Sequence, residues 1–438
     1  MSSAARRRVA VLTTEPLGAR LAGPAIRAIE LGRVLADEFE VVVASTAPAA
    51  DGGGWQSLDV AALRLLAARC EVVVLGGDIL AANPWLATAG PAIVVDLYDP
   101  FHLEQLEQAR DLGVSGRRSV VFGTIDALNA EAILGDTFLC AAGRQRDLWL
   151  GHLAACGRVN PTTYDADPSL RELLRIVPFG VPSEPPVAGE PALRGVVDGI
   201  GVDDEILLWG GGIYNWFDPV TLIKAVDVLR VERPNVRLVF MGAQHPNPAV
   251  ATMRAAVDAR AISAERGLTG VHVFFSDAFS SGWIPYADRG RYLREATIGV
   301  STHHDHIETE FSFRTRILDY FWAGLPVVTT RGDALAAVVD VAGAGRTVAP
   351  GDVDGLAAAL GELLGDASAL QAAAAASARL ADDYRWSVVA QPLVEFCRNP
   401  YRAPDLADVE TRAAIVARAR RAPKRSLAAR VASRLPKR

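Results

Sequence analysis

Two runs of short, almost entirely apolar segments dominate the sequence, and stretches with helical periodicity separate their members. The first run contains RVAVLTT, EVVVAST, CEVVVLGG and AIVVDLY, with the helical pattern AIRAIELGRVLADEF between its first two members. The second run contains EILLWGGG, VRLVFMG, VHVFFSD, IGVSTHH and PVVTT, each followed by a helical stretch. Apolar strands that alternate with helices are typical of parallel sheets covered on both faces. The sequence therefore predicts α/β architecture with two doubly wound, Rossmann-like domains.

The domain boundaries follow from this alternation of strand and helix patterns and from one Pro- and Gly-rich segment, PFGVPSEPPVAGEPALRG. A chain of 438 residues is too long for one core, so two domains are expected. Two sheets in tandem are expected to face each other across a cleft, with ligands at the carboxyl ends of the strands. We assign residues 1–180 to the N-terminal domain, 181–196 to a linker, 197–380 to the second domain, 381–410 to C-terminal helices expected to pack back on the first domain, and 411–438 to a basic tail.

Charge is distributed unevenly along the chain. The net charge is −6, but residues 411–438 carry ten Lys and Arg and no acidic residue. The rest of the chain has 35 basic and 51 acidic residues, which argues against a nucleic-acid partner. The tail suits peripheral contact with an anionic membrane. A solvated, disordered tail is the equally open alternative.

The location expected from the sequence is the cytoplasm, with the tail at the inner face of the membrane if it binds lipid. No apolar run approaches the about 20 residues that span a bilayer, and the first residues lack a signal-peptide pattern. The four cysteines, Cys70, Cys140, Cys156 and Cys397, form no CxxC pair. Such spacing indicates reduced thiols rather than a disulfide framework or a cysteine zinc site.

The glycine loops do not indicate a nucleotide cofactor. The first strand is followed by Gly18 and Gly23 in a GxxxxGP pattern, which is neither the dinucleotide fingerprint nor a P-loop. The next strand ends in VVVAST, without the acid that holds a dinucleotide ribose. The second domain opens with GGGIYNWFDP, which fits a phosphate-binding loop at a helix start. A tight turn remains open, because Asp218 and Pro219 resemble an N-cap and first-turn pair.

The segment HHDHIETEFSFRTRILDYFWAGLP contains the densest group of candidate site residues. Arg314 and Arg316 stand at an expected helix start, where a cation is unfavourable unless an anion is bound. The alternative is a pair of arginines that form salt bridges with Glu308 and Glu310. The histidines have no HxxxH spacing and no nearby cysteine, so we expect no metal and a ligand hydrogen bond from His304.

A second group, in VVDLYDPFHLE, follows a strand of the first domain. Asp96, Asp99 and His102 are candidates for positioning or polarising a hydroxyl of a substrate. The two carboxylates are three residues apart, unlike a metal-binding DxD motif. For Asp96, a helix-capping role is the alternative.

These motifs, in this order, resemble those of GT-B glycosyltransferases. The resemblance rests on GGGIYNWFDPVTLIKAV, EFSFRTRILDYFWAGLPVVTTRGD and GRTVAPGDVDGLAAALGELL in the second domain, and on AGPAIRAIELGRVLA and VVDLYDPFHLE in the first. It covers about residues 8–400 and is closest to glycosyltransferase family 4, a bacterial, retaining type. It implies a hexosyltransferase of glycan biosynthesis that uses an NDP-sugar donor, a hydroxyl acceptor (a glycan, a lipid-linked sugar or a small molecule) and no cofactor.

The resemblance also implies site residues. Asp319 matches the second acid of the family's Glu-x7-Glu pair, the ribose ligand, whereas the first position falls on Phe311 and Glu310 stands one residue earlier. Trp216, Phe217 and Asp218 occupy the place of the family's loop lysine. The expected catalytic residues are Asp96, Asp99, His102 and Glu310; the expected donor-binding residues are Gly211, Gly212, His304, Ser312, Phe313, Arg314, Arg316 and Asp319; Gly23 and Arg27 are expected on the acceptor side.

Two other functions fit the same architecture. A non-catalytic, accessory GT-B protein would bind a nucleotide sugar without transferring it, and the altered acid pair and missing lysine would suit that role. A sugar-nucleotide epimerase would need acid and base groups at the sugar C2. Donor hydrolysis without acceptor separates the three functions: release of NDP, binding without turnover, or an isomerised donor.

Overall fold

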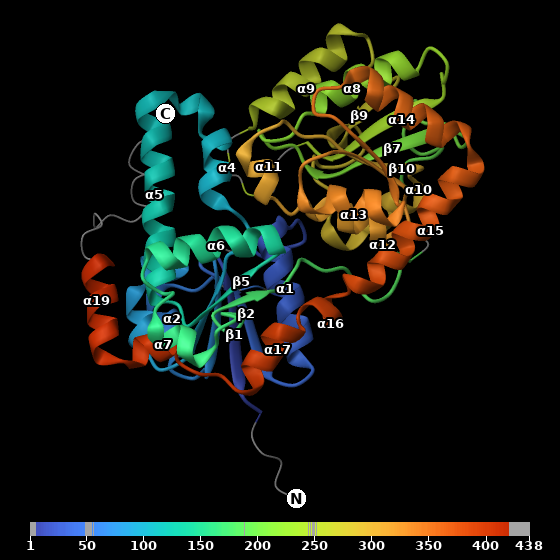
Figure 1. Ribbon diagram of the computed structural model, residues 1–438. Coiled ribbons are helices and arrows are strands. Elements are labelled where there is room, and N and C mark those ends of the chain that lie inside the picture. Colours follow the sequence, from blue (N-terminus) through green and yellow to red (C-terminus); the bar gives the residue numbers. More distant parts are fainter. Residues whose placement is uncertain are drawn as a thin grey trace, which may run out of the picture. The chain divides into compact units, whose positions relative to one another are not determined.

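The computed structural model describes residues 6–48, 55, 57–187, 189–243, 245, 247, 250 and 252–419. The chain divides into two compact units (Figure 1). The first unit contains residues 1–18, 23–179 and 389–438, and the second contains 19–22 and 180–388. Residues 181–196, expected to be a linker, fall within the second unit. The tail from residue 420 onward lies outside the described residues, so its membrane contact stays a prediction.

The first unit is built on a parallel sheet. Within the described residues the sheet has six strands in the order β2-β1-β3-β4-β5-β6, so the direction of strand addition reverses between β1 and β3. The strands are β1 (Arg8–Thr13), β2 (Glu40–Ser45), β3 (Val72–Gly76), β4 (Ala92–Asp96), β5 (Thr137–Cys140) and β6 (Leu174–Ile176). The helices are α1 (Gly23–Ala36), α2 (Val60–Ala67), α3 (Ile79–Ala82), α4 (Phe101–Gln108), α5 (Gly113–Leu134), α6 (Gly143–Ala155), α7 (Pro161–Ala166), α17 (Gln391–Arg398), α18 (Pro404–Ala407) and α19 (Val409–Ala419), with 3₁₀ turns η1 (Pro84–Thr88) and η2 (Arg110–Leu112).

Helices cover both faces of this sheet. Along β1, Ala10 and Leu12 pack into a cluster with apolar residues of α2, α3, α5 and α6. Val9 and Val11, which alternate with them, point to the opposite face, where α1 packs against β1 and β2. Burial on both faces explains why the strands read as continuous apolar runs rather than as alternating ones.

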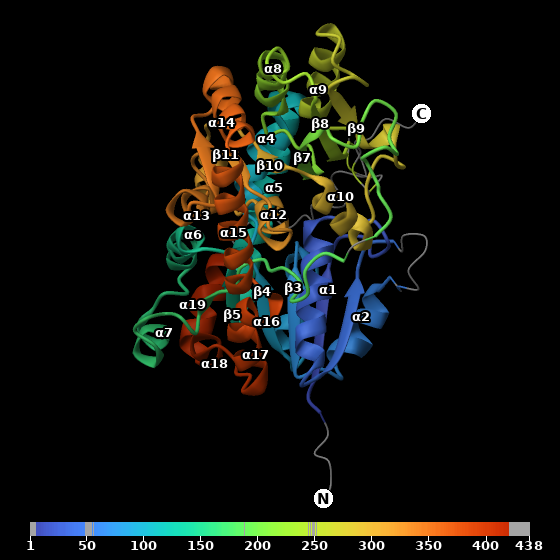
Figure 2. The ribbon, with the colours of Figure 1, turned by 90° about the vertical axis from the view of Figure 1, so that its right-hand side faces the viewer.

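The C-terminal segment of the chain completes the first unit. Figures 1 and 2 show α17, α18 and α19, coloured red, against that unit. The side chains of Arg158 and Asp405 are fully buried and form a two-bond ion pair of 2.7 and 3.1 Å. The other guanidinium nitrogen of Arg158 donates to the carbonyls of Ala132 and Gly135. Arg402 likewise pairs with buried Asp136 at 3.0 Å.

The second unit repeats the architecture. Within the described residues its parallel sheet also has six strands, in the order β12-β11-β10-β7-β8-β9, with the reversal between β7 and β10. The strands are β7 (Glu205–Gly212), β8 (Val236–Gly242), β9 (Val273–Phe275), β10 (Ile298–Ser301), β11 (Val327–Thr330) and β12 (Gly345–Val348). The helices are α8 (Pro219–Leu229), α9 (Arg254–Glu265), α10 (Arg289–Glu295), α11 (Ile307–Phe311), α12 (Thr315–Trp322), α13 (Ala334–Ala342), α14 (Val353–Gly365), α15 (Ala367–Asp383) and α16 (Trp386–Val389), with 3₁₀ turns η3 (Ser276–Ala278) and η4 (Tyr286–Asp288).

One face of this second sheet is covered by α8, α9 and α14 (Figure 2), whose apolar residues pack with Leu207, Trp209 and Phe240. On the other face, α12 is held by Tyr320. The Tyr320 hydroxyl accepts from the Gly210 amide at 2.8 Å and lies 3.0 and 2.8 Å from the carbonyls of Leu208 and Val300. It therefore joins α12 to both β7 and β10, at the place where the strand order reverses.

Gly299 allows this contact. A Cβ at that position of β10 would lie 2.3 Å from the Tyr320 ring, closer than non-bonded atoms approach. The prediction of two doubly wound α/β sheets is confirmed. No helix among the described residues combines the length and apolarity needed to cross a bilayer.

The buried Arg158–Asp405 pair yields a stability prediction. Asp405→Ala leaves the Arg158 guanidinium buried without its carboxylate, which costs about 3–5 kcal/mol in comparable pairs. We expect a marked fall in the urea concentration at which the full chain unfolds, followed by tryptophan fluorescence.

The matched control is Glu38→Gln, which breaks the exposed pair between Arg398 and Glu38. Water screens that pair, so no measurable change is expected. Equal midpoints for the two variants would show that the Arg158–Asp405 pair does not stabilise the folded chain.

Candidate functional site

The candidate site lies at the carboxyl ends of β7 and β10 in the second unit. Ligands of open parallel sheets bind where the strand order reverses, because the loops that follow the two strands diverge there. Here the end of β7 contributes Gly210–Gly212, the loop after β10 contributes His303–His306, and α12 follows soon after α11. The segments with the densest candidate residues in the sequence are thus adjacent in this unit.

The glycine loop at the end of β7 is shaped by close packing. The β7–β8 register shifts between Trp209 and Gly212, and Gly211 has a φ of +71° with open space where a Cβ would stand. A Cβ on Gly212 would lie 2.9 Å from the Tyr214 ring and 3.1 Å from that of Trp283. Glycine is therefore required at Gly211 by the backbone conformation and at Gly212 by the neighbouring rings.

The helix that follows this loop does not offer a free N-terminus. Asp218 is the N-cap of α8, and its carboxylate accepts from the Thr221 amide at 3.0 Å and from the Thr221 hydroxyl at 2.6 Å. Pro219 is the first helical residue, as the N-cap interpretation required. Because a carboxylate already occupies this helix end, a phosphate bound by α8 amides is disfavoured.

Arg314 and Arg316 differ in their partners. Arg314 is the N-cap of α12, and its guanidinium makes two hydrogen bonds, of 2.9 and 2.7 Å, to the buried carboxylate of Glu308. For Arg314, the salt-bridge interpretation is therefore correct for Glu308, although not for Glu310. A bidentate pair leaves Arg314 little charge to offer a diphosphate, which argues against its expected donor-binding role.

Arg316 has no carboxylate partner among the described residues. One guanidinium nitrogen donates to the Gly212 carbonyl at 2.7 Å, and the other, Nη1, has no hydrogen-bond partner. The group is 4.4 Å from the Trp209 ring centre and 3.9 Å from that of Phe217. Burial lowers the pKa of Arg316 to about 10, so the side chain remains charged at neutral pH.

Arg316 is exceptional among the buried arginines. In the described part of the chain five arginine side chains are buried: Arg27, Arg158, Arg289, Arg314 and Arg316. The first four each pair with a carboxylate. A buried charge without a counter-ion is costly, which makes Arg316, alone among these five arginines, a candidate for pairing with an anionic ligand.

Asp319 and Glu310 lie on neighbouring helices with different exposure. Asp319, one turn after Arg316, pairs with Arg289 at 3.1 Å and keeps about a third of its side chain exposed. Arg289 also lies over the rings of Tyr286 and Trp322. Glu310 is exposed on α11. Asp319 is thus held in place yet open to a ligand, whereas Glu310 is free to reach one.

The histidines after β10 contact different groups. His303 is buried and its Nδ1 lies 3.8 Å from the Asp333 carboxylate. His304 is about half exposed, with its Nδ1 3.8 Å from Asp218. His306 lies 3.6 Å from Glu308. No group of three potential metal ligands comes together anywhere in the described residues.

Burial dominates the titration of His303 and Asp333. It lowers the pKa of His303 to about 2, with the nearby Arg314 as the next cause, so the imidazole is neutral. It raises the pKa of Asp333 to about 6, against the favourable charge of Arg314. Asp333 Oδ1 caps α13 by accepting from the Leu335 and Ala336 amides.

Ser312 and Phe313 shape the backbone between α11 and α12. The Ser312 hydroxyl donates to the Thr309 carbonyl at 2.9 Å, and the Phe313 ring is buried with its centre 6.3 Å from that of Tyr384. These contacts are internal to the unit. They argue for positioning roles rather than the direct donor contacts that were expected.

A cavity of about 310 Å³ opens beside the glycine loop. It lies under the first turns of α9, at the carboxyl ends of β7, β8 and β9. Its wall includes Gly212, whose carbonyl binds Arg316 on the other side. The remaining lining is mixed aromatic, apolar and charged: Ile213, Tyr214, Gly242, Ala243, His245, Val250, Thr252, Met253, Ala256, Val257, Arg260, Asp277 and Trp283.

In the first unit, Asp96 is committed to a buried ion pair. Its two oxygens accept from Arg27 at 2.6 and 2.9 Å, and Arg27 also donates to the carbonyls of Val177 and Pro178. The pair argues against a catalytic role for Asp96 and an acceptor contact for Arg27. The capping alternative for Asp96 is also wrong, because Pro100 precedes α4 as its N-cap residue.

His102 points into the first unit. Its ring centre lies 5.5 Å from that of fully buried Trp149, and burial lowers its pKa to about 4. That setting argues against general acid or base chemistry by His102. Asp99 remains a candidate: it hydrogen-bonds the hydroxyl of Tyr98, and that hydroxyl would lie 3.1 Å from a Cβ on Gly23. Gly23 therefore leaves room for the tyrosine.

Comparison with known proteins places the chain among sugar-transferase folds. Residues 204–366 match the family model described as Glycosyl transferases group 1. A sucrose-phosphate synthase from Thermosynechococcus elongatus matches with a TM-score of 0.62 and 14% identity, over 90% of this chain and 98% of that chain. Anabaena Alr3699/HepE, in complex with UDP-glucose, matches with a TM-score of 0.64 and 14% identity, over 89% and 99%. The fold is GT-B.

WaaG, a glycosyltransferase involved in lipopolysaccharide biosynthesis, also shares the GT-B fold, with a TM-score of 0.62, 16% identity and coverage of 90% and 99%. A search of curated protein sequences finds no match. The GT-B match extends over both units, and the family match lies within the second, which contains the glycine loop, Arg316 and the cavity.

The buried Asp333 makes stability depend on pH in a defined direction. Its pKa is about 6 in the folded chain against an ordinary value of 3.8, so folding favours the protonated acid. Asp333 therefore lowers the free energy of unfolding as pH rises from about 4 to 6, by about 3 kcal/mol in total. Asp333→Asn keeps the Oδ1 cap without the charge. The stability difference, variant minus wild type, should grow across that range and level off above pH 6.

Urea unfolding of both proteins at pH 4.5, 5.5, 6.5 and 7.5 measures this difference. The comparison removes the contribution of all other titrating groups, which the two proteins share. A difference that stays constant with pH would mean that Asp333 is ionised throughout.

Proposed function

We propose that this chain is a cytoplasmic glycosyltransferase that moves a sugar from a nucleoside diphosphate donor to a hydroxyl group, with retention of anomeric configuration. The acceptor is a glycan, a lipid-linked sugar or a small molecule. The match of residues 204–366 to the group 1 glycosyl transferases and the GT-B fold support the transferase class. UDP-glucose bound to Alr3699/HepE supports a nucleotide-sugar donor.

The observation that carries the proposal is Arg316. A nucleoside diphosphate is the leaving group, and its negative charge increases as the glycosidic bond to phosphate breaks. A cation held nearby stabilises that charge most where water is excluded. Arg316 is buried and charged, has no carboxylate partner in the described part of the chain, and donates to the carbonyl of Gly212 at the end of β7.

The ribose, the transferred sugar and the base of the nucleotide sugar each have a candidate binding group in this unit. Carboxylates accept two hydroxyl hydrogen bonds at once, which suits Asp319 for the ribose and Glu310 for the transferred sugar. The cavity under α9 suits the base, because it combines aromatic walls, Tyr214 and Trp283, with polar groups. In this assignment Arg314 acts through Glu308, by holding α11 and the start of α12 in place.

Retention follows if the acceptor attacks from the side on which the diphosphate departs. The bond from the sugar C1 to the phosphate oxygen breaks, the bond from C1 to the acceptor oxygen forms, and the acceptor proton passes to the departing phosphate oxygen. No protein nucleophile is needed in this step. In the first unit, Asp99 is the carboxylate best suited to orient an acceptor hydroxyl, because Asp96 is occupied by Arg27.

Incubation of the full chain with a panel of nucleotide sugars, without and with simple acceptors, tests the proposal. Release of NDP with formation of a glycoside that keeps the donor's anomeric configuration, seen by NMR, is the expected result. Binding without any turnover would favour an accessory protein, as the phenylalanine at position 311 allows. An isomerised donor would favour an epimerase. Either result would overturn the transferase assignment.

Arg316 gives a prediction that separates binding from folding. Arg316→Met removes the charge but keeps an unbranched side chain, so we expect the affinity for nucleoside diphosphates to fall at least about a hundredfold. The thermal midpoint of the free protein should be unchanged or raised, because an unpaired buried charge is lost. Isothermal titration calorimetry and thermal unfolding measure the two effects.

Arg346→Met is the matched control, because Arg346 is exposed on β12 of the same unit and its guanidinium donates to the Gly345 carbonyl. It should leave affinity and thermal midpoint unchanged. Unaltered affinity in Arg316→Met would remove Arg316 from the donor site.

A further inference from the structure

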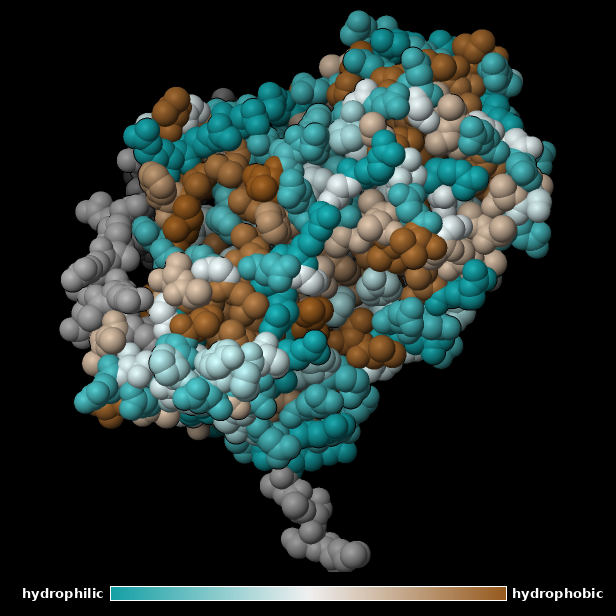
Figure 3. All heavy atoms as spheres, in the orientation of Figure 1, coloured by the Kyte–Doolittle hydropathy of each residue, from teal (hydrophilic) through white to brown (hydrophobic). Residues whose placement is uncertain are grey.

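Two buried polar side chains of the second unit, His303 and Asp333, lie close together beside the candidate site. His303 follows β10 and Asp333 follows β11, and these two strands are neighbours in the sheet. The face of the second unit seen in Figure 3 is a mixture of polar and apolar atoms, but this pair lies in the interior. His303 is fully buried and Asp333 is 3% exposed. Buried polar groups need hydrogen-bond partners, so the partners of both side chains are decisive.

The two side chains face each other through atoms that no other group serves. His303 Nδ1 lies 3.8 Å from Asp333 Oδ2, and neither atom has a hydrogen-bond partner among the described residues. A water molecule does not fit between them, because a bridging water needs two contacts of about 2.8 Å. A movement of about 1 Å would bring the two atoms to hydrogen-bond distance. Each atom is therefore the partner that the other lacks.

The second ring nitrogen of His303 also faces an acceptor. Nε2 lies 3.3 Å from the Arg331 carbonyl. A carbonyl and an ionised carboxylate can only accept, and a neutral imidazole has a single N–H. The ring can thus donate to Arg331 or to ionised Asp333, but not to both. One additional proton satisfies both contacts: Nε2–H donates to the carbonyl, and the protonated Oδ2 of Asp333 donates to Nδ1.

The surroundings favour this proton on the carboxyl group rather than on the ring. Burial raises the pKa of Asp333 to about 6 and lowers that of His303 to about 2. Four further titratable groups act on the pair: Arg314, Glu308, His304 and His306. Arg314 disfavours the proton on Asp333 and Glu308 favours it, but these two groups form two hydrogen bonds with each other. Their effects therefore largely cancel.

His303 connects loops that follow three strands of the sheet. Its backbone forms an isolated antiparallel bridge with Phe217, in the loop after β7. Its ring faces Arg331 and Asp333, in the loop after β11. The next residue, His304, was expected to contact the ligand, and α11 begins soon after it. The contacts of the ring therefore bear on how this segment is held.

We infer that His303 and Asp333 are positioning residues that share one proton, and that this proton sets the tautomer of the ring and the order of segment 303–311. With the proton, both contacts of the ring to the loop after β11 form. Without it, the ring N–H moves to Nδ1, because a bond to a charged carboxylate is stronger, and the contact with Arg331 is lost. The effect on donor binding rests on the proposed function, whereas the shared proton does not.

Nitrogen-15 NMR of the full chain, labelled at its seven histidines, tests the shared proton. The His303 signals are assigned by their loss in His303→Gln. In the wild type the ring should pass from the Nε2–H to the Nδ1–H tautomer as pH rises, with a midpoint near 6. In Asp333→Asn the side-chain amide donates to Nδ1 and does not titrate, so the Nε2–H tautomer should persist at every pH.

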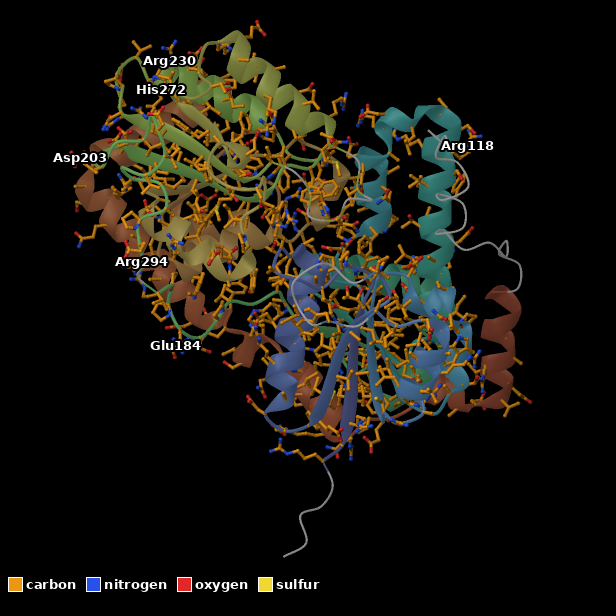
Figure 4. The ribbon with its side chains drawn as sticks, turned by 180° about the vertical axis from the view of Figure 1, so that it is seen from behind. Arg118, Glu184, Asp203, Arg230, His272 and Arg294 are labelled. Atoms are coloured by element: carbon orange, nitrogen blue, oxygen red, sulfur yellow. The ribbon has the colours of Figure 1, made fainter. Side chains whose placement is uncertain are left out.

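His272 is an internal reference for this measurement. It precedes β9, at the amino end of the parallel strands, and its Nδ1 lies 3.0 Å from the Val236 carbonyl. Figure 4 labels it in the same part of the second unit as Arg230 and Asp203. Because His272 lies at the opposite end of the strands from His303, its signals should be the same in the wild type and in the asparagine variant.

Amide hydrogen exchange of segment 303–311 tests the positioning role without any ligand. At pH 8 exchange should be at least about threefold slower in Asp333→Asn than in the wild type, and at pH 5 the two should be equal. Comparison at the same pH removes the intrinsic dependence of exchange on pH. Asp340→Asn is the matched control, because Asp340 is exposed on α13, the helix that Asp333 caps. It should exchange as the wild type does at both pH values.

Calorimetric titration with UDP-glucose extends the test to the donor. Asp333→Asn should bind at least about threefold more tightly than the wild type at pH 8 and equally at pH 5, because a larger fraction of the variant is in the ordered state. The ratio removes the titration of the donor phosphates, which both proteins meet. If neither protein binds, UDP-glucose is excluded as the donor, and the exchange measurement still decides the inference.

Two results would overturn the inference. A wild-type His303 with one tautomer from pH 4.5 to 8, or the same tautomer change in the asparagine variant, would show that Asp333 and His303 share no proton. Equal exchange of segment 303–311 in the two proteins at pH 8 would show that the proton does not position this segment. Neither result depends on sugar transfer, so failure of the proposed function would be seen separately.

Discussion

The hydroxyl group of Tyr320 is the contact on which the candidate site depends. It joins the Gly210 amide of β7 to the carbonyl edge of β7 and β10, at the point where the strand order of the second unit reverses. That contact fixes the rotation of α12, and one turn earlier on the same helix Arg316 is brought under the Gly212 carbonyl. This arrangement requires glycine at position 299, since a Cβ there would collide with the Tyr320 ring.

The rest of the site follows from how its charges are matched. Glu308 neutralises Arg314, Arg289 neutralises Asp319, and Asp218 closes the end of α8. Among the described residues of this unit, Arg316 is then the one buried arginine without a carboxylate partner. An arrangement of this kind is organised before any ligand arrives, which is the condition under which fixed charges stabilise a developing anion most effectively. If Arg316 binds the diphosphate, as proposed, no lysine is needed in the loop after β7, where Trp216 and Phe217 stand.

Sequence reasoning predicted the architecture well because parallel strands buried on both faces leave a continuous apolar signature. It predicted the site less completely. Helix position and resemblance singled out Arg316 and Asp319, whose roles in donor binding stay predictions. Arg314 was expected to share the role of Arg316, and only the folded geometry shows that Arg314 pairs with Glu308. The structure argues against Asp96 because a carboxylate after a strand gives the same sequence pattern whether it faces a substrate or a buried arginine 69 residues away. It argues against His102 because the ring packs against Trp149. The cavity under α9 was missed, although the loops after β8 and β9 lie at the carboxyl edge where one was to be expected.

The late return of the chain to the first unit bears on how the protein is made. Arg158 is fully buried in that unit, yet Asp405, its counter-ion, is synthesised 247 residues later. At about 5–20 residues per second, translation needs roughly 12 to 50 seconds to cover that interval. During that time the continuous segment 180–388 can fold on the ribosome. The N-terminal sheet meanwhile lacks the carboxylate that neutralises the Arg158 guanidinium. The N-terminal unit of the nascent chain, although translated first, would therefore be the part that chaperones can bind for longest.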